Sequence, residues 1–425
     1  MNITAFGIAV VTLCASLAFI PASASDFTLQ IFGNANMDDT IDELDIEYVQ
    51  GIIDGTKDET DLADANYDGT VDEKDIAQIE QIMRGEEETL TLIDDIGDAV
   101  TIQKPIESIV LIEGYAALYE TWRVLGIKDQ VVGINDRYVK PGGIRYSERY
   151  YPELIMKHNV GSTKEPDLEV IASLAPDLIY IDHPMEGLKD IIAQAFPNIP
   201  LICMDITYED FTRNTRTTGY IFDKREESER YINWRNGWKN IIEEPTAEIS
   251  DENRPLVFLS SNYEPGLNEF PSRGGPRHDP LITGAGGKNI WEGMTGMPTA
   301  NMVDPEWLLE ENPDIIIFTS SLSYSGFEFN SDDTIKLAAL YEDFMSRPEF
   351  AELDAVKNKR VYFINLPHLL FGGASGIIAE AYFAKWIQPD LSVDINPTKI
   401  HQEFLELQGV DLDLGEYGVF VYPLV

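Results

Sequence analysis

Seven short apolar runs rich in Val and Ile, separated by helical patterns, constrain the fold of this chain more than any other feature. The runs are "SIVLI" from Ser108, "VVGI" from Val131, "DLIYI" from Asp177, "PLICM" from Pro200, "PLVFLS" from Pro255, "DIIIF" from Asp314 and "RVYFI" from Arg360. Runs of this length and composition suit parallel strands that are buried on both faces. The sequence therefore predicts an α/β fold.

A single long helical segment, "DKREESERYINWRNGWKNIIEEP" from Asp223 to Pro245, separates the first four runs from the last three. Asp223 and Glu226 resemble a capping box, and one face carries Tyr231, Trp234, Trp238 and Ile241. About 20 helical residues span roughly 30 Å. We therefore expect one helix to join two α/β lobes, with a cleft between them.

The first 24 residues are typical of a secretory signal peptide. The apolar run "GIAVVTLCASLAFI" is too short to span a bilayer comfortably, and Ala22, Ser23 and Ala24 form a cleavage pattern. Leu13 stands before Cys14 where a lipid-attachment signal has a small residue, which disfavours a lipid anchor. Cleavage after Ala24 would leave Cys203 as the single cysteine, without an intramolecular disulfide. Retention of the segment as an anchor is the alternative.

Two acidic loops, "NANMDDTIDELD" from Asn34 and "DANYDGTVDEKD" from Asp64, form an internal repeat thirty residues apart. Each precedes an apolar helical pattern, with Ile46, Val49, Ile52 and Ile53 after the first loop and Ile76, Ile79, Ile82 and Met83 after the second. Calcium takes six to eight oxygen ligands, which a short loop can supply from alternate positions. The sequence therefore predicts two calcium sites.

The predicted calcium ligands occupy matching positions in the two loops, with Thr40 and Thr70 contributing backbone carbonyls. They are Asn34, Asn36, Asp38, Thr40 and Asp45 in the first loop, and Asp64, Asn66, Asp68, Thr70 and Asp75 in the second. Asp42 and Asp72 are candidates for contact through water. The first site is expected to be the weaker one, because Asn34 replaces the first Asp and Asp39 replaces the turn glycine.

This repeat resembles a type I dockerin, because its loops end in Asp and no helix is evident before either loop. The resemblance covers about 60 residues. It implies a small all-α module that folds on calcium and binds a cohesin on a surface protein. Bracing of the following domain is the alternative role.

The charge balance indicates which partners to expect. The chain has 74 acidic and 31 basic residues and a formal net charge of −43. Such a surface repels phosphate backbones and anionic lipid, so a nucleic-acid role is disfavoured and cations are natural partners. Adaptation to a salty environment would give the same balance.

Stretches spread over residues 90–410 resemble class III periplasmic substrate-binding proteins of ABC importers for ferric siderophores, haem and cobalamin. The matching stretches are "VGSTKEPDLEVIASLAPDLIYID", "ITGAGGKNI", "VDPEWLLEENPDIIIF", "AVKNKRVYFIN" and "YFAKWIQPDLSVDINPTKIHQEFLE". The resemblance implies two Rossmann-like lobes joined by a long helix. It also implies a metal chelate in the cleft, and a permease with its ATPase as partners.

By the same resemblance, Glu169 and Glu306 are expected to dock on permease arginines, one from each lobe. Ligand contacts are expected where strand ends of the two lobes face each other. The candidates are Tyr115, His183, Met185, Tyr263, Arg273, Arg277, His278, Tyr324 and His368. Tyrosine and histidine suit haem iron or a corrin, whereas arginines suit an anionic ferric chelate. Among these residues, Arg273 to His278 form the strongest cluster.

The expected organisation is a signal peptide over 1–24, a dockerin-like module over 26–86, lobe 1 over 89–213, the inter-lobe helix over 214–248 and lobe 2 over 249–425. The expected function is extracytoplasmic capture of a metal chelate and its delivery to a permease. A dockerin-tethered adhesion or carbohydrate-binding component is the alternative. Enzyme chemistry has no motif in the sequence: neither a phosphate loop, HExxH nor a nucleophile elbow is present.

Overall fold

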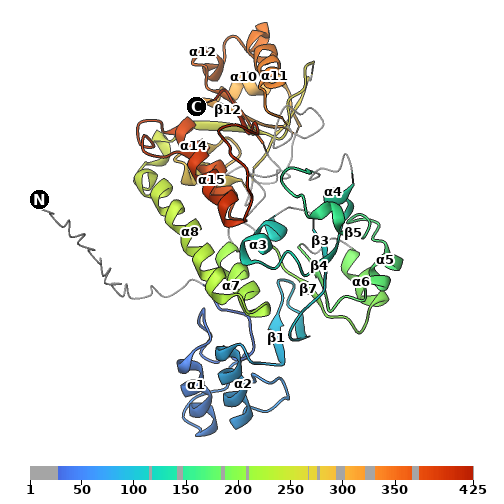
Figure 1. The fold of residues 1–425 in the computed structure, drawn as a ribbon. Helices are drawn as coiled ribbons and strands as arrows, with labels where there is room; N and C mark the ends of the chain where they lie inside the picture. Colours follow the sequence, from blue (N-terminus) through green and yellow to red (C-terminus); the bar gives the residue numbers. More distant parts are fainter. Residues whose placement is uncertain are drawn as a thin grey trace, which may run out of the picture.

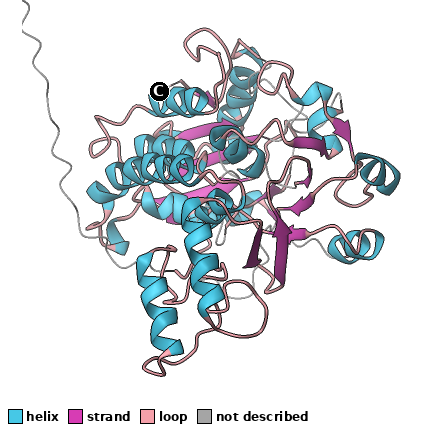
Figure 2. Ribbon diagram, turned by 60° about the horizontal axis from the view of Figure 1, so that its bottom comes forward, coloured by secondary structure: helices cyan, strands magenta, loops and turns pink. Residues whose placement is uncertain are grey.

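The chain forms two α/β lobes with a small helical module beneath them (Figures 1 and 2). We describe a computed structural model over residues 27–113, 117–140, 147–182, 187–206, 210–266, 268–274, 278–292, 302–320, 331–365 and 373–424. The side chains of Ser320 and Asn365 are left out of the description. Within these ranges, no helix is long and apolar enough to cross a membrane.

Lobe 1 is built on a parallel five-stranded sheet in the order β5-β4-β3-β6-β7. Its central strand is fully buried, as the apolar runs predicted. The strands are β3 (Ile109–Ile112), β4 (Val131–Ile134), β5 (His158–Asn159), β6 (Leu178–Ile181) and β7 (Leu201–Cys203). The helices are α3 (Ala117–Leu125), α4 (Asp136–Val139), α5 (Leu168–Leu174) and α6 (Leu188–Ala195), with the 3-10 turn η1 (Leu154–Met156).

Lobe 2 repeats this plan with the order β10-β8-β12-β13-β14, in which only the edge strand β14 is antiparallel. Its strands are β8 (Leu256–Ser260), β10 (Lys288–Asn289), β12 (Ile315–Ser320), β13 (Val361–Asn365) and β14 (Val421–Tyr422), and β9 (Phe270–Pro271) pairs separately with β11 (Met302–Val303). Its helices are α9 (Asp279–Gly284), α10 (Pro305–Glu311), α11 (Ile335–Ser346), α12 (Asp354–Lys357), α14 (Gly376–Ile387) and α15 (Pro397–Leu407). The 3-10 turns are η2 (Glu244–Thr246), η3 (Asp251–Asn253) and η5 (Pro348–Phe350).

The predicted long helix is present as α8 (Arg225–Glu243), preceded by the antiparallel α7 (Phe211–Ile221). It runs from the bottom of lobe 1 towards lobe 2 (Figure 1). Trp234 and Trp238 both donate their indole N–H to one oxygen of Glu403 on α15, at 3.1 and 2.8 Å. This shared acceptor fastens α8 to lobe 2.

Two details of the predicted helix differ in the structure. Asp223 lies outside the helix with φ +55°, and its carboxylate binds Lys104 instead of capping α8. Ile241 is 51% exposed, and its neighbour Ile242 is the residue that is buried near the helix end. Both differences arise from tertiary contacts that the helical period does not encode.

The N-terminal module consists of α1 (Glu43–Ile53) and α2 (Glu73–Arg84), each following one acidic loop. Val49, Ile79 and Ile82 are buried between the helices, as their spacing predicted. An antiparallel hairpin of β1 (Thr89–Ile93) and β2 (Ala99–Gln103) connects the module to lobe 1, and Ile31 forms an isolated bridge with Leu92. The core of the module is continuous with that of lobe 1 and α7.

Candidate functional site

The parallel strands of each lobe end side by side, and this is the edge from which the predicted ligand residues follow in sequence. In lobe 1, β3 and β6 are neighbours, and Tyr115 and His183 come shortly after them. In lobe 2, β12 and β13 are neighbours, and Tyr324 and His368 come after them. Tyr115, His183, Met185, Arg277, Tyr324 and His368 themselves lie outside the described residues.

Two of the described candidates, Arg273 and His278, flank one loop at the end of β8. The Arg273 amide donates to the Leu259 carbonyl at 2.7 Å, which places Arg273 beside the strand end. Asn289 holds the base of the loop, with its amide nitrogen donating to the Arg273 carbonyl at 3.1 Å and to Asp279 at 2.7 Å. His278 is 4% exposed and Arg273 is half-buried. The predicted loop is thus anchored at both ends.

Tyr263 has a different position from the one a ligand contact requires. Its ring is 1% exposed and packs in an aromatic cluster with Phe270, Phe318 and Phe344. Its hydroxyl donates to Asp343, and burial raises its pKa above the ordinary value for tyrosine. In this structure Tyr263 is part of the lobe 2 core.

Glu113, which precedes Tyr115 closely in the sequence, holds the start of α3 in place. Its carboxylate accepts hydrogen bonds from the amide of Leu118 at 2.8 Å, from the amide of Tyr119 at 3.3 Å and from the hydroxyl of Tyr138 at 2.8 Å. A buried carboxylate with several donors is held in one geometry. This role was not predicted, because Tyr138 lies 25 residues away from Glu113 in the sequence.

Glu169 and Glu306 occupy equivalent places in the two lobes. Each is exposed in the first turn of a seven-residue helix, α5 or α10. The preceding aspartate caps the helix: Asp167 accepts from the Val170 amide at 3.0 Å, and Asp304 accepts from the Trp307 amide at 2.8 Å. Each helix ends in a left-handed residue, Ala175 or Asn312.

The strands that follow these helices are also anchored alike. Asp177, before β6, accepts from the amide of Ser108 at 2.8 Å, and Asp314, before β12, accepts from the amide of Leu256 at 2.7 Å. Each bond ties the strand to the beginning of its neighbour, β3 or β8. The two glutamates are therefore presented by the same supersecondary unit, once per lobe.

Direct contacts join the lobes. Arg149, between β4 and β5, forms an ion pair with Asp332, between β12 and β13. At a second contact, Gln408 at the end of α15 accepts from Arg123 at 3.2 Å and from the Tyr150 hydroxyl at 3.0 Å. The sequence did not predict these residues, because each pair is more than 180 residues apart.

Within each acidic loop, the carboxylates accept hydrogen bonds from backbone amides of the same loop. In the second loop, Asp75 accepts from the amides of Asn66 and Asp72 at 3.0 and 2.7 Å, and Asp64 accepts from Asp68 and Gly69. In the first loop, Asp45 accepts from Asn36 and Asp42, and Asp38 accepts from Thr40. The ninth and twelfth residues thus also serve as capping boxes of α1 and α2.

The donor set of these loops suits a hard cation in its chemistry, since it combines carboxylates with amide and carbonyl oxygens. Burial raises the pKa of Asp45 to about 6 and raises that of Asp75, and neighbouring carboxylates add to both shifts. The side-chain oxygen of Asn34 is buried without a hydrogen-bond partner. Over the described residues, however, no group of three or more His, Cys, Asp or Glu side chains is arranged to hold a metal ion.

Comparison with known proteins identifies the lobes. The sequence model of the periplasmic binding protein family matches residues 117–366. The petrobactin-binding protein YclQ of Bacillus subtilis is 24% identical over 248 residues, which cover 58% of this chain and 71% of the relative. The Fe(3+)-citrate-binding protein YfmC of the same species is 27% identical over 208 residues, which cover 48% of this chain and 58% of the relative.

The same fold is found among solved structures. The TroA-like periplasmic binding protein FepB of Veillonella parvula superposes with a TM-score of 0.63 at 22% identity, covering 78% of this chain and 98% of that one. Members of the matched family are non-enzymatic components of transport systems. The family match spans more than half of the chain, and we conclude that the chain belongs to the periplasmic binding protein family.

Proposed function

We propose that this chain is the extracytoplasmic substrate-binding component of an ABC importer, and that it captures a metal chelate between its two lobes. The observation that carries this proposal is the paired presentation of Glu169 and Glu306. Two exposed carboxylates on equivalent units, one per lobe, suit a permease that contacts both lobes at once. The signal-like segment over residues 1–24 supports the extracytoplasmic location.

A ferric chelate is the substrate class that we favour. The names of the relatives YclQ and YfmC refer to petrobactin and to Fe(3+)-citrate, and the second of these is a ferric chelate. Arg273 lies at the end of β8, and Arg277 follows it four residues later in the sequence. Two arginines at the cleft would attract an anionic chelate through charge-assisted hydrogen bonds. Haem and cobalamin are the other members of the proposed substrate class.

Titration of the chain with ferric siderophores, ferric citrate, haemin and cobalamin tests the substrate class. We expect micromolar or tighter binding of at least one ferric chelate. Replacement of Arg273 by Ala should weaken it by about tenfold to a hundredfold, since a hydrogen bond to a charged group contributes about 1.5–3 kcal/mol. Arg230→Ala, an exposed change on α8, is the control. Absence of binding to all four ligand types would refute the proposed substrate class.

We further propose that residues 26–86 form a dockerin-like calcium module, with the first loop the weaker site. The paired loops, their mixed oxygen donors and the raised pKa values of Asp45 and Asp75 support cation binding. Calorimetry with calcium chloride, after treatment with a chelator, tests this. A cohesin-bearing surface protein is the partner that the resemblance implies, and a binding assay with type I cohesin, with and without calcium, tests that partner separately.

A further inference from the structure

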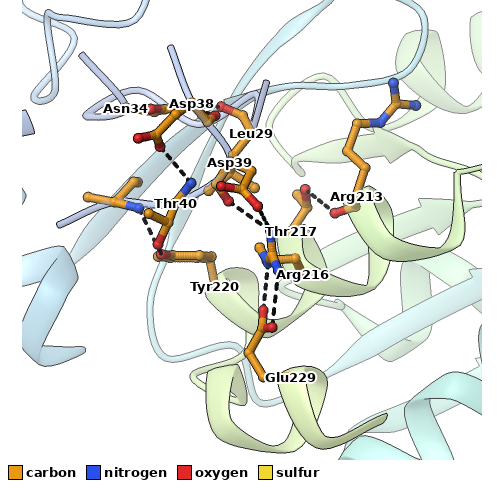
Figure 3. A network of polar contacts seen from close by, with 11 residues as sticks. Leu29, Asn34, Asp38, Asp39, Thr40, Arg213, Arg216, Thr217, Tyr220 and Glu229 are labelled. Atoms are coloured by element: carbon orange, nitrogen blue, oxygen red, sulfur yellow. Dashed lines mark hydrogen bonds and ion pairs between the residues drawn. The ribbon is translucent and has the colours of Figure 1, made fainter. Parts of the chain in front are cut away.

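The first acidic loop, Asn34 to Asp45, lies directly against α7 and α8 (Figure 3). Arg216 on α7 is the centre of the contact. Its Nη1 donates to the carboxylate of Asp39 and, at 3.2 Å, to the Asp39 carbonyl. Its Nε and Nη2 donate to the two oxygens of Glu229 on α8, at 2.5 and 3.1 Å. One half-buried guanidinium thus joins the loop to both helices.

Tyr220, one turn further along α7, makes a second contact with the same loop. Its hydroxyl accepts from the Ile41 amide at 3.1 Å and lies 3.4 Å from the Thr40 hydroxyl. Its carbonyl accepts from Lys104 at 2.9 Å, and Lys104 also binds Asp223 at 2.6 Å. The end of α7 is therefore held by the module on one side and by the β1–β2 hairpin on the other.

The end of α2 provides a third contact. Arg225, the first residue of α8, donates from Nη1 to the carbonyls of Ile82 and Met83, at 2.6 and 3.2 Å. These carbonyls belong to the last turn of α2, where backbone acceptors have no partner within the helix. A positive side chain is favourable at that end. The beginning of α8 thus closes the end of α2.

The two loops of the repeat differ at the sixth position, which in the first loop makes the contact with Arg216. Gly69, at the sixth position of the second loop, is exposed and adopts φ +90°. Asp39 occupies the sixth position of the first loop and is not among the described non-glycine residues with positive φ. A glycine there would have no side chain to reach Arg216. Asp38, Asp39 and Thr40 of the first loop are half-buried, whereas the matching Asp68, Gly69 and Thr70 face solvent.

We propose that the first loop is a docking site whose partner is the chain's own α7–α8 pair, so that the N-terminal module and the inter-lobe helices unfold as one cooperative unit. Separation would leave the Arg216 guanidinium without the Asp39 carboxylate and expose the shared core. The module is then a fixed support for the helix that joins the lobes, and its second loop remains available to solvent. This inference concerns folding and does not depend on which substrate the cleft binds.

Hydrogen exchange of the 425-residue chain, read by mass spectrometry, tests the coupling. In the unmodified chain, the slowest amides of α1 and α2 should exchange through the same opening event as those of α8. In Arg216→Ala and Asp39→Asn, protection in α1 and α2 should fall at least about tenfold more than protection in α14, which lies outside the interface. Tyr220→Phe removes the acceptor for Ile41 and the contact with the Thr40 hydroxyl but no charge, and should give a smaller loss in the same segments.

Arg230→Ala is the matched control, since Arg230 is an exposed arginine of α8 whose ion pair is with Glu227 on its own helix. It should leave the exchange of α1 and α2 unchanged. Two results would overturn the proposal. One is a module that already opens independently of α8 in the unmodified chain. The other is unchanged protection in Asp39→Asn and Tyr220→Phe, which retain the packing of the interface and should fold even if Arg216→Ala does not.

Discussion

Arg149 and Asp332 join the two lobes through two parallel hydrogen bonds, 2.6 Å from Nη1 to Oδ1 and 3.2 Å from Nη2 to Oδ2. Asp332 also accepts from the Gly418 amide at 3.0 Å, and the Tyr417 ring lies 5.1 Å from the guanidinium carbon of Arg149. Asp332 follows, in the sequence, the segment that holds the predicted ligand residue Tyr324. The pair is therefore placed to stabilise the arrangement of lobes seen here.

Removal of this pair should speed the release of bound ligand. In Arg149→Ala and Asp332→Asn we expect dissociation to be a few times faster, because exposed pairs contribute modestly. Stopped-flow displacement measures the rate. Lys357→Ala, which removes an exposed ion pair with Glu352 inside lobe 2, is the control. An unchanged rate in both cross-lobe variants would contradict a role in holding the lobes.

The stabilisation that the Arg149–Asp332 pair provides should be lost at low pH. The hydrogen bond from Arg149 lowers the pKa of Asp332 below its ordinary value. The stabilisation is therefore present above the ordinary carboxyl pKa of about 3.9 and is lost as pH falls through the lowered value. The Arg149→Ala and unmodified chains should differ by a constant factor in release rate from about pH 5 to pH 8. A factor that varies between about pH 5 and pH 8 would show that another titratable group controls the difference in release rate.

Charge reversal at Glu169 and Glu306 should separate delivery from capture. The double variant to Lys should abolish uptake, because two repulsive contacts would replace two attractive ones at the permease, while ligand affinity stays unchanged. Uptake by cells and titration of the isolated chain measure the two effects. Glu310→Lys, an exposed change on the same helix as Glu306, is the control. Loss of affinity in the double variant would place the two glutamates in the cleft instead.

Cys203 should be an unreactive thiol in the folded chain. It is fully buried, and burial raises its pKa to about 12, with the carboxylate of Asp94 adding to the shift. The thiolate is the reactive form, so reaction with a disulfide reagent at pH 8 should be far slower than in the unfolded chain. A Cys14→Ser background isolates the signal from Cys203. Equal rates in the folded and unfolded chains would contradict the burial.

Calcium dependence should reside mainly in the second loop. Asp68→Ala should lower the calcium-dependent stabilisation of the module and leave ligand capture in the cleft intact, because Asp68 is exposed and far in sequence from the strand ends. Thermal melting with and without a chelator measures the stabilisation. Asp61→Ala, an exposed carboxylate just before the loop, is the control. Loss of ligand capture in Asp68→Ala would make the module part of the binding machinery.

The sequence predicted the strands that are buried on both faces and the helices that have a regular apolar spacing. The seven apolar runs all contain strands, because a strand covered on both faces needs uninterrupted apolar residues. The repeat predicted α1 and α2, since both helices use the same spacing. The hairpin β1–β2 and the edge strand β14 were not predicted, because their alternating or very short patterns give a weak signal.

The contacts between distant segments could not be predicted in this way. Asp39 and Arg216 are 177 residues apart, and Arg149 and Asp332 are 183 apart. Which partner a surface charge meets is decided by the packing of whole elements, about which the local period carries no information. Tyr263 illustrates the same limit, because a tyrosine just after a strand suits a cleft and a core equally well, and here it packs in the core.

The indole groups of Trp234 and Trp238 meet at a single oxygen of Glu403, where α8 reaches lobe 2. Indole emission responds to the charge and hydrogen bonding around the ring. A shift of α15 relative to α8 would alter both indoles at once. The chain therefore carries an intrinsic optical reporter of lobe movement, which can be followed on ligand addition without any attached dye.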